Sequence, residues 1–366
     1  ASAVKSSGLG ERIAYNFIIR YVSSYNSIIY SIFALTFILS LLIPHPMPRA
    51  FIIMSVMSVI ISSAEIPKED AVKIGFTVFA AAVPVSMIFL TGDSVINPLA
   101  VQASGQSISW IEWFIYMGPP NILASIATCL LILVLFKPTR SVKINKEEMR
   151  ERLNALGKMT NKEKRTVVWL GIAVALWMTD SMHGINIGWI TLLVAMLMSF
   201  PVIGELITPK QLSEVPLHVL LFLTAAMAIG RVGADTGMNT WIAETILPSS
   251  IPDNPYILAI IIALISMGIH MFLGSVVTVI GIAIPALLIF TEPMGINPIV
   301  TTLLAYTAIG IHYVLPFHHL DVLVGIGDEN GMYSQAEVMK LGVILTFLVV
   351  VIVLIEIPYW KLIGLY

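Results

Sequence analysis

Residues 90–98 read Leu-Thr-Gly-Asp-Ser-Val-Ile-Asn-Pro, and they follow an apolar segment long enough to cross a lipid bilayer. A second polar stretch, residues 315–321, reads Leu-Pro-Phe-His-His-Leu-Asp and follows another such segment. Glycine and proline at these depths favour irregular backbone over continuous helix. Inside a membrane, irregular backbone is tolerated only where it is buried in protein or lines a water-filled cavity. The two stretches therefore predict interrupted transmembrane helices.

The composition is that of a membrane protein. The 366 residues are 57% hydrophobic and 11% charged, and the mean hydropathy is +0.91. Soluble domains carry about 25% charged residues, so a soluble enzyme, a disordered chain and a nucleic-acid binder are excluded. The single cysteine, Cys129, excludes an internal disulfide and a cysteine-based metal site. We predict an all-α polytopic membrane protein, multi-pass in a prokaryotic plasma membrane.

A basic loop gives the predicted orientation. Residues 137–165 hold ten Lys or Arg and four Glu, a third of all charged residues. Loops rich in Lys and Arg stay on the cytoplasmic side, so we expect this loop in the cytoplasm. A spanning helix needs about 20 apolar residues. On that basis we predict spans at 71–91, 111–136, 166–181, 184–204, 215–232, 296–315 and 336–358.

Two other apolar runs are too long for one crossing, and each is broken near its middle. The first covers residues 27–64, with Arg49 as its only charged residue, and is interrupted by the proline-rich residues 44–48. The second covers residues 254–291 and is interrupted by Gly-Ser at 274–275. We predict that each run forms a re-entrant hairpin, in which two half-length helices meet at a tip near the membrane midplane. Two ordinary crossings joined by a tight loop are the alternative.

The two halves of the chain repeat the same order of features. Residues 8–14, Gly-Leu-Gly-Glu-Arg-Ile-Ala, resemble residues 237–243, Gly-Met-Asn-Thr-Trp-Ile-Ala, and each begins a partly polar helix before a hairpin. An interrupted span and a further span then follow. Counted from the cytoplasmic loop, paired elements cross in opposite directions. This order predicts an inverted repeat, which together with interrupted helices is typical of secondary transporters. Its parts are residues 1–136, with hairpin 27–64 and a broken helix near 91–98; the basic loop 137–165; and residues 166–366, with hairpin 254–291 and a broken helix near 316–321.

Ionisable side chains at membrane depth are costly and mark candidate sites. Asp93 and Asp321 lie in the two interruptions, where a carboxylate beside a helix end suits a cation or a transferable proton. The alternative is that each caps a following helix. Together with small neighbours they form the predicted coupling-ion set: Gly92, Asp93, Ser94, Gly274 and Asp321.

A second set is predicted to bind substrate. A histidine can switch its charge near neutral pH and hold an anion when protonated. An arginine either binds oxygens bidentately or pairs with a carboxylate. Hydroxyl and amide groups add further contacts, although such residues are also common in loops for conformational reasons. The set is His45, Arg49, Thr91, Asn97, Ser275, Thr278, His318 and His319.

Two further histidines, His270 and His312, lie on apolar helix faces and are interpreted as packing residues. The histidines lack the His-x-x-x-His spacing of a helical zinc site. We therefore predict no metal beyond a sodium ion, and no cofactor beyond sodium or a proton as the coupling ion.

The order of elements and several short strings resemble the divalent anion/sodium symporter family of dicarboxylate, citrate and sulfate carriers. The strings are residues 7–14, 89–92 and 97–100, with the arginine after the first tip. The resemblance covers nearly the whole chain and implies sodium-coupled symport, a homodimer, and further spans before Ala1, so that the first repeat is truncated. It also implies a Ser-Asn-Thr motif at each tip. At the matching positions this chain has His45-Pro46-Met47 and Ser275-Val276-Val277.

The predicted function is therefore transport of a small anion, a di- or tricarboxylate or sulfate, by sodium-coupled symport. An enzyme is not expected, because no Gly-x-Ser-x-Gly nucleophile motif occurs. The alternatives are a proton-coupled carrier of a different small substrate and a degenerate, non-transporting membrane subunit.

Overall fold

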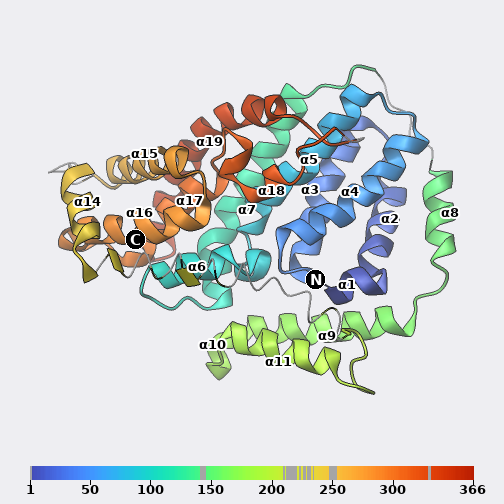
Figure 1. Ribbon diagram of the computed structural model, residues 1–366, viewed down its shortest axis with the longest axis horizontal. Coiled ribbons are helices and arrows are strands. Elements are labelled where there is room, and N and C mark those ends of the chain that lie inside the picture. The colour runs from blue at the N-terminus through green and yellow to red at the C-terminus, as the bar shows by residue number, and fades with distance from the viewer. Residues whose placement is uncertain are drawn as a thin grey trace.

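The computed structural model describes residues 2–140, 146–208, 211, 221, 224–225, 228, 232–233, 235–246, 254–328 and 331–366. Over these residues the regular structure is helical, and the one β-bridge, between Ile326 and Tyr333, is isolated. In Figure 1, α2 to α5 lie on one side and α14 to α17 on the other, with α7 and α19 between them. The predicted all-α polytopic fold is confirmed.

The first half of the chain contains one helix for each predicted segment. The predicted spans 71–91 and 111–136 correspond to α5 and α7, and the polar arm at residues 8–14 begins α2. The bounds are α1 (Ser2–Ser7), α2 (Leu9–Tyr21), α3 (Tyr25–Leu42), α4 (Pro46–Ser63), α5 (Lys68–Ser86), η1 (Leu90–Asp93), α6 (Ile96–Ala103) and α7 (Trp110–Leu135).

The second half continues in the predicted order. The predicted span 215–232 lies largely outside the described residues, and the basic loop 137–165 contains a helix of its own, α8. The bounds are α8 (Glu147–Ala155), α9 (Asn161–Met178), α10 (Asp180–His183), α11 (Ile187–Ser199), α14 (Met238–Ile246), α15 (Pro255–Leu273), α16 (Val276–Thr291), η2 (Glu292–Met294), α17 (Pro298–Ile311), η3 (Pro316–His318), α18 (Leu320–Leu323) and α19 (Gln335–Leu362).

The helices of both hairpins are longer than the half-length helices predicted, and in the second hairpin α15 has 19 residues and α16 has 16. Both α3 and α4 have 18 residues, about 27 Å at 1.5 Å per residue. No glycine or proline interrupts α3 before Ile43. Pro46 is at the first helical position of α4, where proline is tolerated. Among the described residues, six helices are long and apolar enough to cross a membrane: α3, α4, α7, α15, α16 and α19. Re-entrance of the hairpins stays a prediction.

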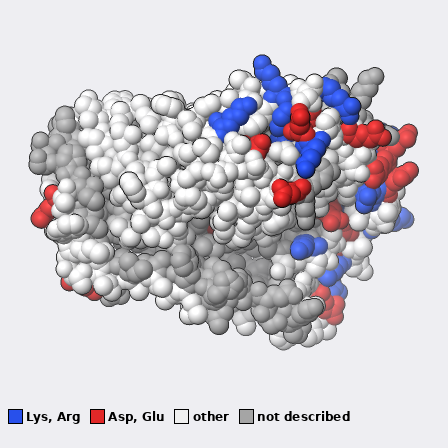
Figure 2. Space-filling model, turned by 45° about the horizontal axis from the view of Figure 1, so that its top comes forward, with Lys and Arg blue, Asp and Glu red and all other residues white. Residues whose placement is uncertain are grey.

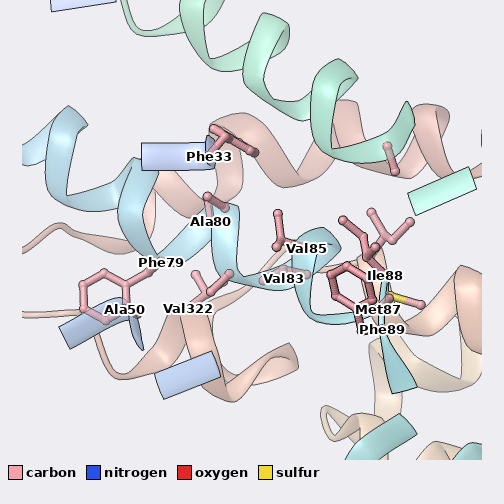
Figure 3. Close-up of a cluster of buried hydrophobic side chains, with 14 of the residues drawn as sticks. Phe33, Ala50, Phe79, Ala80, Val83, Val85, Met87, Ile88, Phe89 and Val322 are labelled. Atoms are coloured by element: carbon pink, nitrogen blue, oxygen red, sulfur yellow. The ribbon is translucent and has the colours of Figure 1, made fainter. Parts of the chain in front are cut away.

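Helix α5 lies at the centre of the first half. It packs against α3, α4 and α7 of its own half and against α18 of the other half. Figure 3 shows Phe79 and Ala80 of α5 among Phe33 of α3, Ala50 of α4 and Val322 of α18, all of them buried. Short side chains on α5 let these neighbours approach closely. The second interruption is thereby packed against the helix that precedes the first.

Helices α7 and α19 run antiparallel and are joined at both ends. The Lys340 ammonium donates to the Leu135 carbonyl at 2.8 Å. At the other end, Pro119 and Pro120 lie inside α7 and lack the N–H groups that would bond the carbonyls of Ile115 and Tyr116. Both carbonyls accept from α19 instead, from the Tyr359 hydroxyl and the Trp360 Nε1, respectively.

Charged side chains gather at one end of the molecule, and most of the face in Figure 2 is free of them. Arg12 of α2 forms an ion pair with Glu163, which also caps α9 by accepting from the Thr160 N–H at 2.7 Å. The hydrogen bond from Arg12 lowers the pKa of Glu163 below its usual range, more than burial raises it. The basic loop is thus attached to the amino-terminal arm.

Candidate substrate and coupling-ion site

The first interruption starts where α5 ends and leaves backbone carbonyls without helical partners. Side chains supply those partners. The fully buried Asn97 of α6 places its Nδ2 within 3.3 Å of three carbonyl oxygens, and Trp113 of α7 donates its Nε1 to a fourth at 3.0 Å. The four carbonyls are those of Ser86, Phe89, Leu90 and Met87. The Asn97 Oδ1 accepts from the Tyr306 hydroxyl of α17, so both ends of this amide hold the interruption together.

Arg49 joins the first tip to the first interruption. It lies in the first turn of α4 and is fully buried. Its Nη1 donates to the Gly92 carbonyl at 2.6 Å and to the Ile43 carbonyl at 3.1 Å. Its Nε and Nη2 have no hydrogen-bond partner. A buried guanidinium with unused donors is suited to bind an oxyanion.

Two further contacts connect the same segments. The Ser94 N–H donates to the Pro44 carbonyl at 3.2 Å. The half-buried His45 caps α4, because its Nδ1 accepts from the Met47 N–H at 3.3 Å. The Ser94 side chain remains exposed to solvent.

Asp93 and Thr91 both have partners in the first half. The Asp93 Oδ1 accepts from the N–H groups of Val95 and Ile96 at 2.9 and 3.1 Å, so the carboxylate caps the start of α6. The Thr91 hydroxyl oxygen accepts from the Trp110 Nε1 at 3.0 Å. The contacts of Asp93 therefore agree with the alternative in which its carboxylate caps the following helix. The charge of Asp93 also acts on Arg49.

The second interruption contains an acid and an imidazole without hydrogen-bond partners. His319 and Asp321 are buried, and 3.8 Å separates the His319 Nδ1 from the Asp321 Oδ2. That separation exceeds a hydrogen bond, and both atoms lack any other partner. The neighbouring His318 is engaged, because its Nδ1 accepts from the N–H groups of Val314 and Leu315.

These ionisable residues form one group across the two halves. His45, Arg49 and Asp93 belong to the first tip and interruption, and His319 and Asp321 belong to the second interruption. They are close enough for their charges to act on one another. The packing of α18 on α5 brings them together. We call these five residues the charged cluster, and it holds one guanidinium against two carboxyl groups.

The second tip lies against the second interruption. Gly274 ends α15 with a φ of 62°, and the Ser275 hydroxyl oxygen accepts from the Thr278 N–H at 3.4 Å to begin α16. A Cβ on Gly274 would stand 2.6 Å from the Phe317 ring, so only glycine fits there. Of the three predicted residues at this tip, Gly274 thus lies against Phe317, and Ser275 and Thr278 bond to each other at the start of α16. Within the described residues, no hydrogen bond or ion pair joins them to the charged cluster.

Three histidines connect this tip to the interruption. The ring centroids of His270, His312 and His318 lie 5.4–6.2 Å apart, and all three are buried. The His270 Nε2 lies 3.0 Å from the His318 carbonyl, and the Nδ1 atoms of His270 and His312 are 3.5 Å apart. The two histidines interpreted as packing residues therefore also hold the tip. In the described part of the chain, no group of three His, Cys, Asp or Glu could hold a metal ion.

A cavity of about 1140 Å³, lined by both polar and apolar residues, reaches the first tip and interruption. Pro44, Thr91 and Ser94 line one side of it, and Glu112, Asp180 and Asn186 lie among the residues around it. Water in this cavity would bring solutes to the edge of the charged cluster.

Sequence reasoning missed a buried acid, Glu356, which lies inside the predicted span 336–358. Its position inside an apolar segment was the signal that would have found it. The role of Tyr306, which bonds to Asn97, depends on a contact between the two halves that sequence alone does not reveal.

Known proteins resemble this chain over its whole length. A family model described as "Sodium:sulfate symporter transmembrane region" matches residues 1–366. A membrane protein of Cupriavidus necator is 22% identical over 377 residues, which cover 100% of this chain and 73% of the relative.

Several relatives carry transporter names. The chloroplastic dicarboxylate transporter 1 of Spinacia oleracea is 27% identical over 255 residues, covering 66% of this chain and 44% of that protein. The L-tartrate/succinate antiporter of Escherichia coli strain K12 is 23% identical over 278 residues, which cover 73% of this chain and 56% of that protein. The matches thus span about half the length of these two transporters.

The predicted family resemblance is confirmed, because the family model covers every residue of the chain. The helices long enough to cross a membrane agree with it. The chain is an integral, multi-pass membrane protein that belongs to the family of sodium:sulfate symporter transmembrane regions.

Proposed function

We propose that this protein is a secondary active transporter that moves a small dianion across the membrane. The observation that carries the proposal is Arg49, a fully buried guanidinium whose Nε and Nη2 lack partners at the junction of the first tip and first interruption. Those donors match the oxygens of a carboxylate or a sulfate. His45 and His319 of the same cluster are the proposed additional contacts.

The charges in the cluster explain why transport would be coupled to a cation. Asp93 and Asp321 both act on Arg49, so the cluster holds more negative than positive charge whenever both carboxyl groups are ionised. A dianion bound there would meet repulsion that is strong in a low-dielectric site. Sodium or a proton on a carboxyl group removes that repulsion. Asp321 is the proposed position, since its Oδ2 has no partner whereas Asp93 caps α6.

Sodium is the proposed coupling ion, and a proton is the alternative. The family's description favours sodium. The alternative rests on His319, because an imidazole 3.8 Å from the Asp321 carboxyl group is well placed to share a proton with it. Among dianions, dicarboxylates are favoured by the names of the spinach and Escherichia coli relatives. The word antiporter in one of those names supports exchange as a second mode.

The contacts between the halves support an inverted repeat that alternates between two states. α18 packs on α5, and α6 packs on α16 and α17, so each interruption lies against the other half. Glu112 and Glu337 form matching capping boxes at the starts of α7 and α19. We include in the proposal the homodimer that the family resemblance implies.

Uptake of labelled succinate by the full-length protein in liposomes tests the proposal. Separate samples would carry an inward sodium gradient, an inward proton gradient, or unlabelled succinate inside. Uptake driven by sodium supports symport, uptake driven by protons alone supports the alternative, and uptake only against internal succinate supports exchange. If folded protein neither takes up nor binds succinate or sulfate, that result contradicts transport and favours a non-transporting subunit.

Two matched variants connect the test to the cluster. Arg49→Gln should abolish substrate binding, and Arg20→Gln, which removes an arginine at the end of α2, should leave it unchanged. Equal binding by the Arg49→Gln variant and the unmodified protein would contradict the assignment of Arg49.

A further inference from the structure

Glu356 is a buried acid far along α19 from the helix start. Its side chain is fully buried in the longest helix among the described residues. Its Oε1 accepts from the Thr307 hydroxyl of α17 at 2.7 Å. Its Oε2 is also buried and has no hydrogen-bond partner.

The neighbouring residues place this acid near one membrane surface. Tyr359 and Trp360 follow it by about one turn and bond to carbonyls of α7. Aromatic residues of this kind gather at the membrane–water interface, and Lys361 comes next. Glu356 is therefore about one helical turn, roughly 5 Å, inside that interface.

No basic group neutralises Glu356 in the described part of the chain. Helix α19, which carries Glu356, packs against α5, α7, α15, α17 and η3, and no side chain on these elements forms an ion pair with Glu356. Their titratable groups are Lys68, Glu69, Asp70 and Lys73 of α5; Glu112, Tyr116 and Cys129 of α7; Tyr256 and His270 of α15; Tyr306 of α17; and His318 of η3. On α19 itself they are Glu337, Lys340, Tyr359 and Lys361.

A carboxylate in such a place is costly, because one hydroxyl donor does not replace the hydration of a full charge. A protonated carboxyl group loses that penalty and still accepts from Thr307. We propose that Glu356 is a proton-binding site, separate from the charged cluster, that binds a proton when α17 and α19 are packed together and releases it when they separate.

Helix α17 links this site to the proposed transport site. Thr307 bonds to Glu356, and the adjacent Tyr306 bonds to Asn97 in the first interruption. The same helix leads directly into the second interruption. Loss of the proton would favour water entry between α17 and α19 and shift α17. This consequence for uptake rests on the proposed function, whereas proton binding itself does not.

Infrared spectroscopy of the reconstituted protein tests proton binding without any substrate. The unmodified protein should show a protonated carboxyl C=O band that disappears as the pH is raised, and Glu356→Gln should lack it. Glu337→Gln and Asp321→Asn are the matched controls and should keep it. Thr307→Val should shift the band, because it removes the hydrogen bond to the carboxyl group. An unchanged spectrum in folded Glu356→Gln protein, or a band that does not respond to pH, would overturn the proposal.

The pH profile of succinate uptake tests the link to transport. Titration of one group changes the rate of the unmodified protein by up to about tenfold per pH unit. Glu356→Gln, which resembles the protonated acid, should reduce that change to less than about two-fold. An unaltered pH profile would disprove the link. If the unmodified protein transports nothing, the proposed function fails while the infrared result still decides the proton site.

Discussion

The amide oxygen of Asn97 accepts the hydroxyl proton of Tyr306, although the two residues lie 209 positions apart in the chain. Asn97 also holds the carbonyls at the end of α5. A single side chain therefore closes the first interruption and attaches it to α17 of the other half.

Tyr306→Phe should destabilise the protein, because it leaves the buried Asn97 Oδ1 without a donor. An unsatisfied buried polar group costs about 1–3 kcal/mol. The thermal unfolding midpoint of detergent-solubilised protein measures the effect. Tyr21→Phe is the control, since Tyr21 is exposed, and equal midpoints for the two variants would refute the role given to Tyr306.

Asp321→Asn should lower cation-driven uptake by about tenfold or more while the protein stays folded. The substitution removes the carboxyl group proposed to bind the coupling ion. Uptake with and without the driving gradient, together with the unfolding midpoint, provides the measurement. If the variant takes up as much substrate as the unmodified protein, with the same dependence on the gradient, Asp321 is outside the coupling site.

Tyr359→Phe should destabilise the packing of α7 on α19 by about 1–3 kcal/mol, because the Ile115 carbonyl loses its donor. In a Pro119→Ala background the same change should cost less, since the alanine N–H restores the helical bond to that carbonyl. Unfolding midpoints of the two single variants and the double variant measure this coupling. If the effects of the two single substitutions on the unfolding midpoint are strictly additive, the stabilising role of Tyr359 does not depend on Pro119.

Gly75→Ala should strongly destabilise the protein. A Cβ on this residue of α5 would collide with the Gly331 carbonyl oxygen. Gly268→Ala in α15 is the control, because no atom lies within 4 Å of its added Cβ, and it should be neutral or slightly stabilising through higher helix propensity. Yield of folded protein and unfolding midpoint distinguish the two variants, and similar behaviour would refute the close approach.

The ion pair between Arg12 and Glu163 should make stability depend on pH. The pKa of Glu163 is lowered in the folded protein, so its stabilising effect is fully present above the usual glutamate pKa of about 4.3. The effect is lost as the pH falls through the lower, folded value. Arg12→Gln should therefore lower the unfolding midpoint at pH 7, and the difference should shrink on acidification. A difference that stays constant as the pH falls would contradict the pair.

The interruptions could be predicted from sequence because their residues act locally. Asp93, Gly92 and Pro98 break an apolar segment wherever it folds, and the structure has breaks at both predicted places. The lengths of α3 and α4 were less accessible. A proline-rich tip shows where two helices meet, but it does not show how far each helix extends.

The candidate site was harder to predict because it depends on which partners meet. An asparagine at position 97 does not by itself indicate that its side-chain amide will donate to backbone carbonyls of the same interruption. Likewise, the second tip matches the first in sequence order, yet its Ser275 and Thr278 bond to each other, and no hydrogen bond among the described residues joins them to the charged cluster. The way in which the two halves pack against each other determines which of the predicted residues share one site.

The paired prolines of α7 have a consequence for how the protein is made. Helix α7 emerges from the ribosome more than 200 residues before Tyr359 and Trp360, which bond to its open carbonyls. Until then, those two oxygens have no donor within α7, because prolines stand at positions 119 and 120. A nascent chain without α19 would therefore leave both carbonyls without these donors, so α7 completes its hydrogen bonding only after α19 has been synthesised and has packed against it.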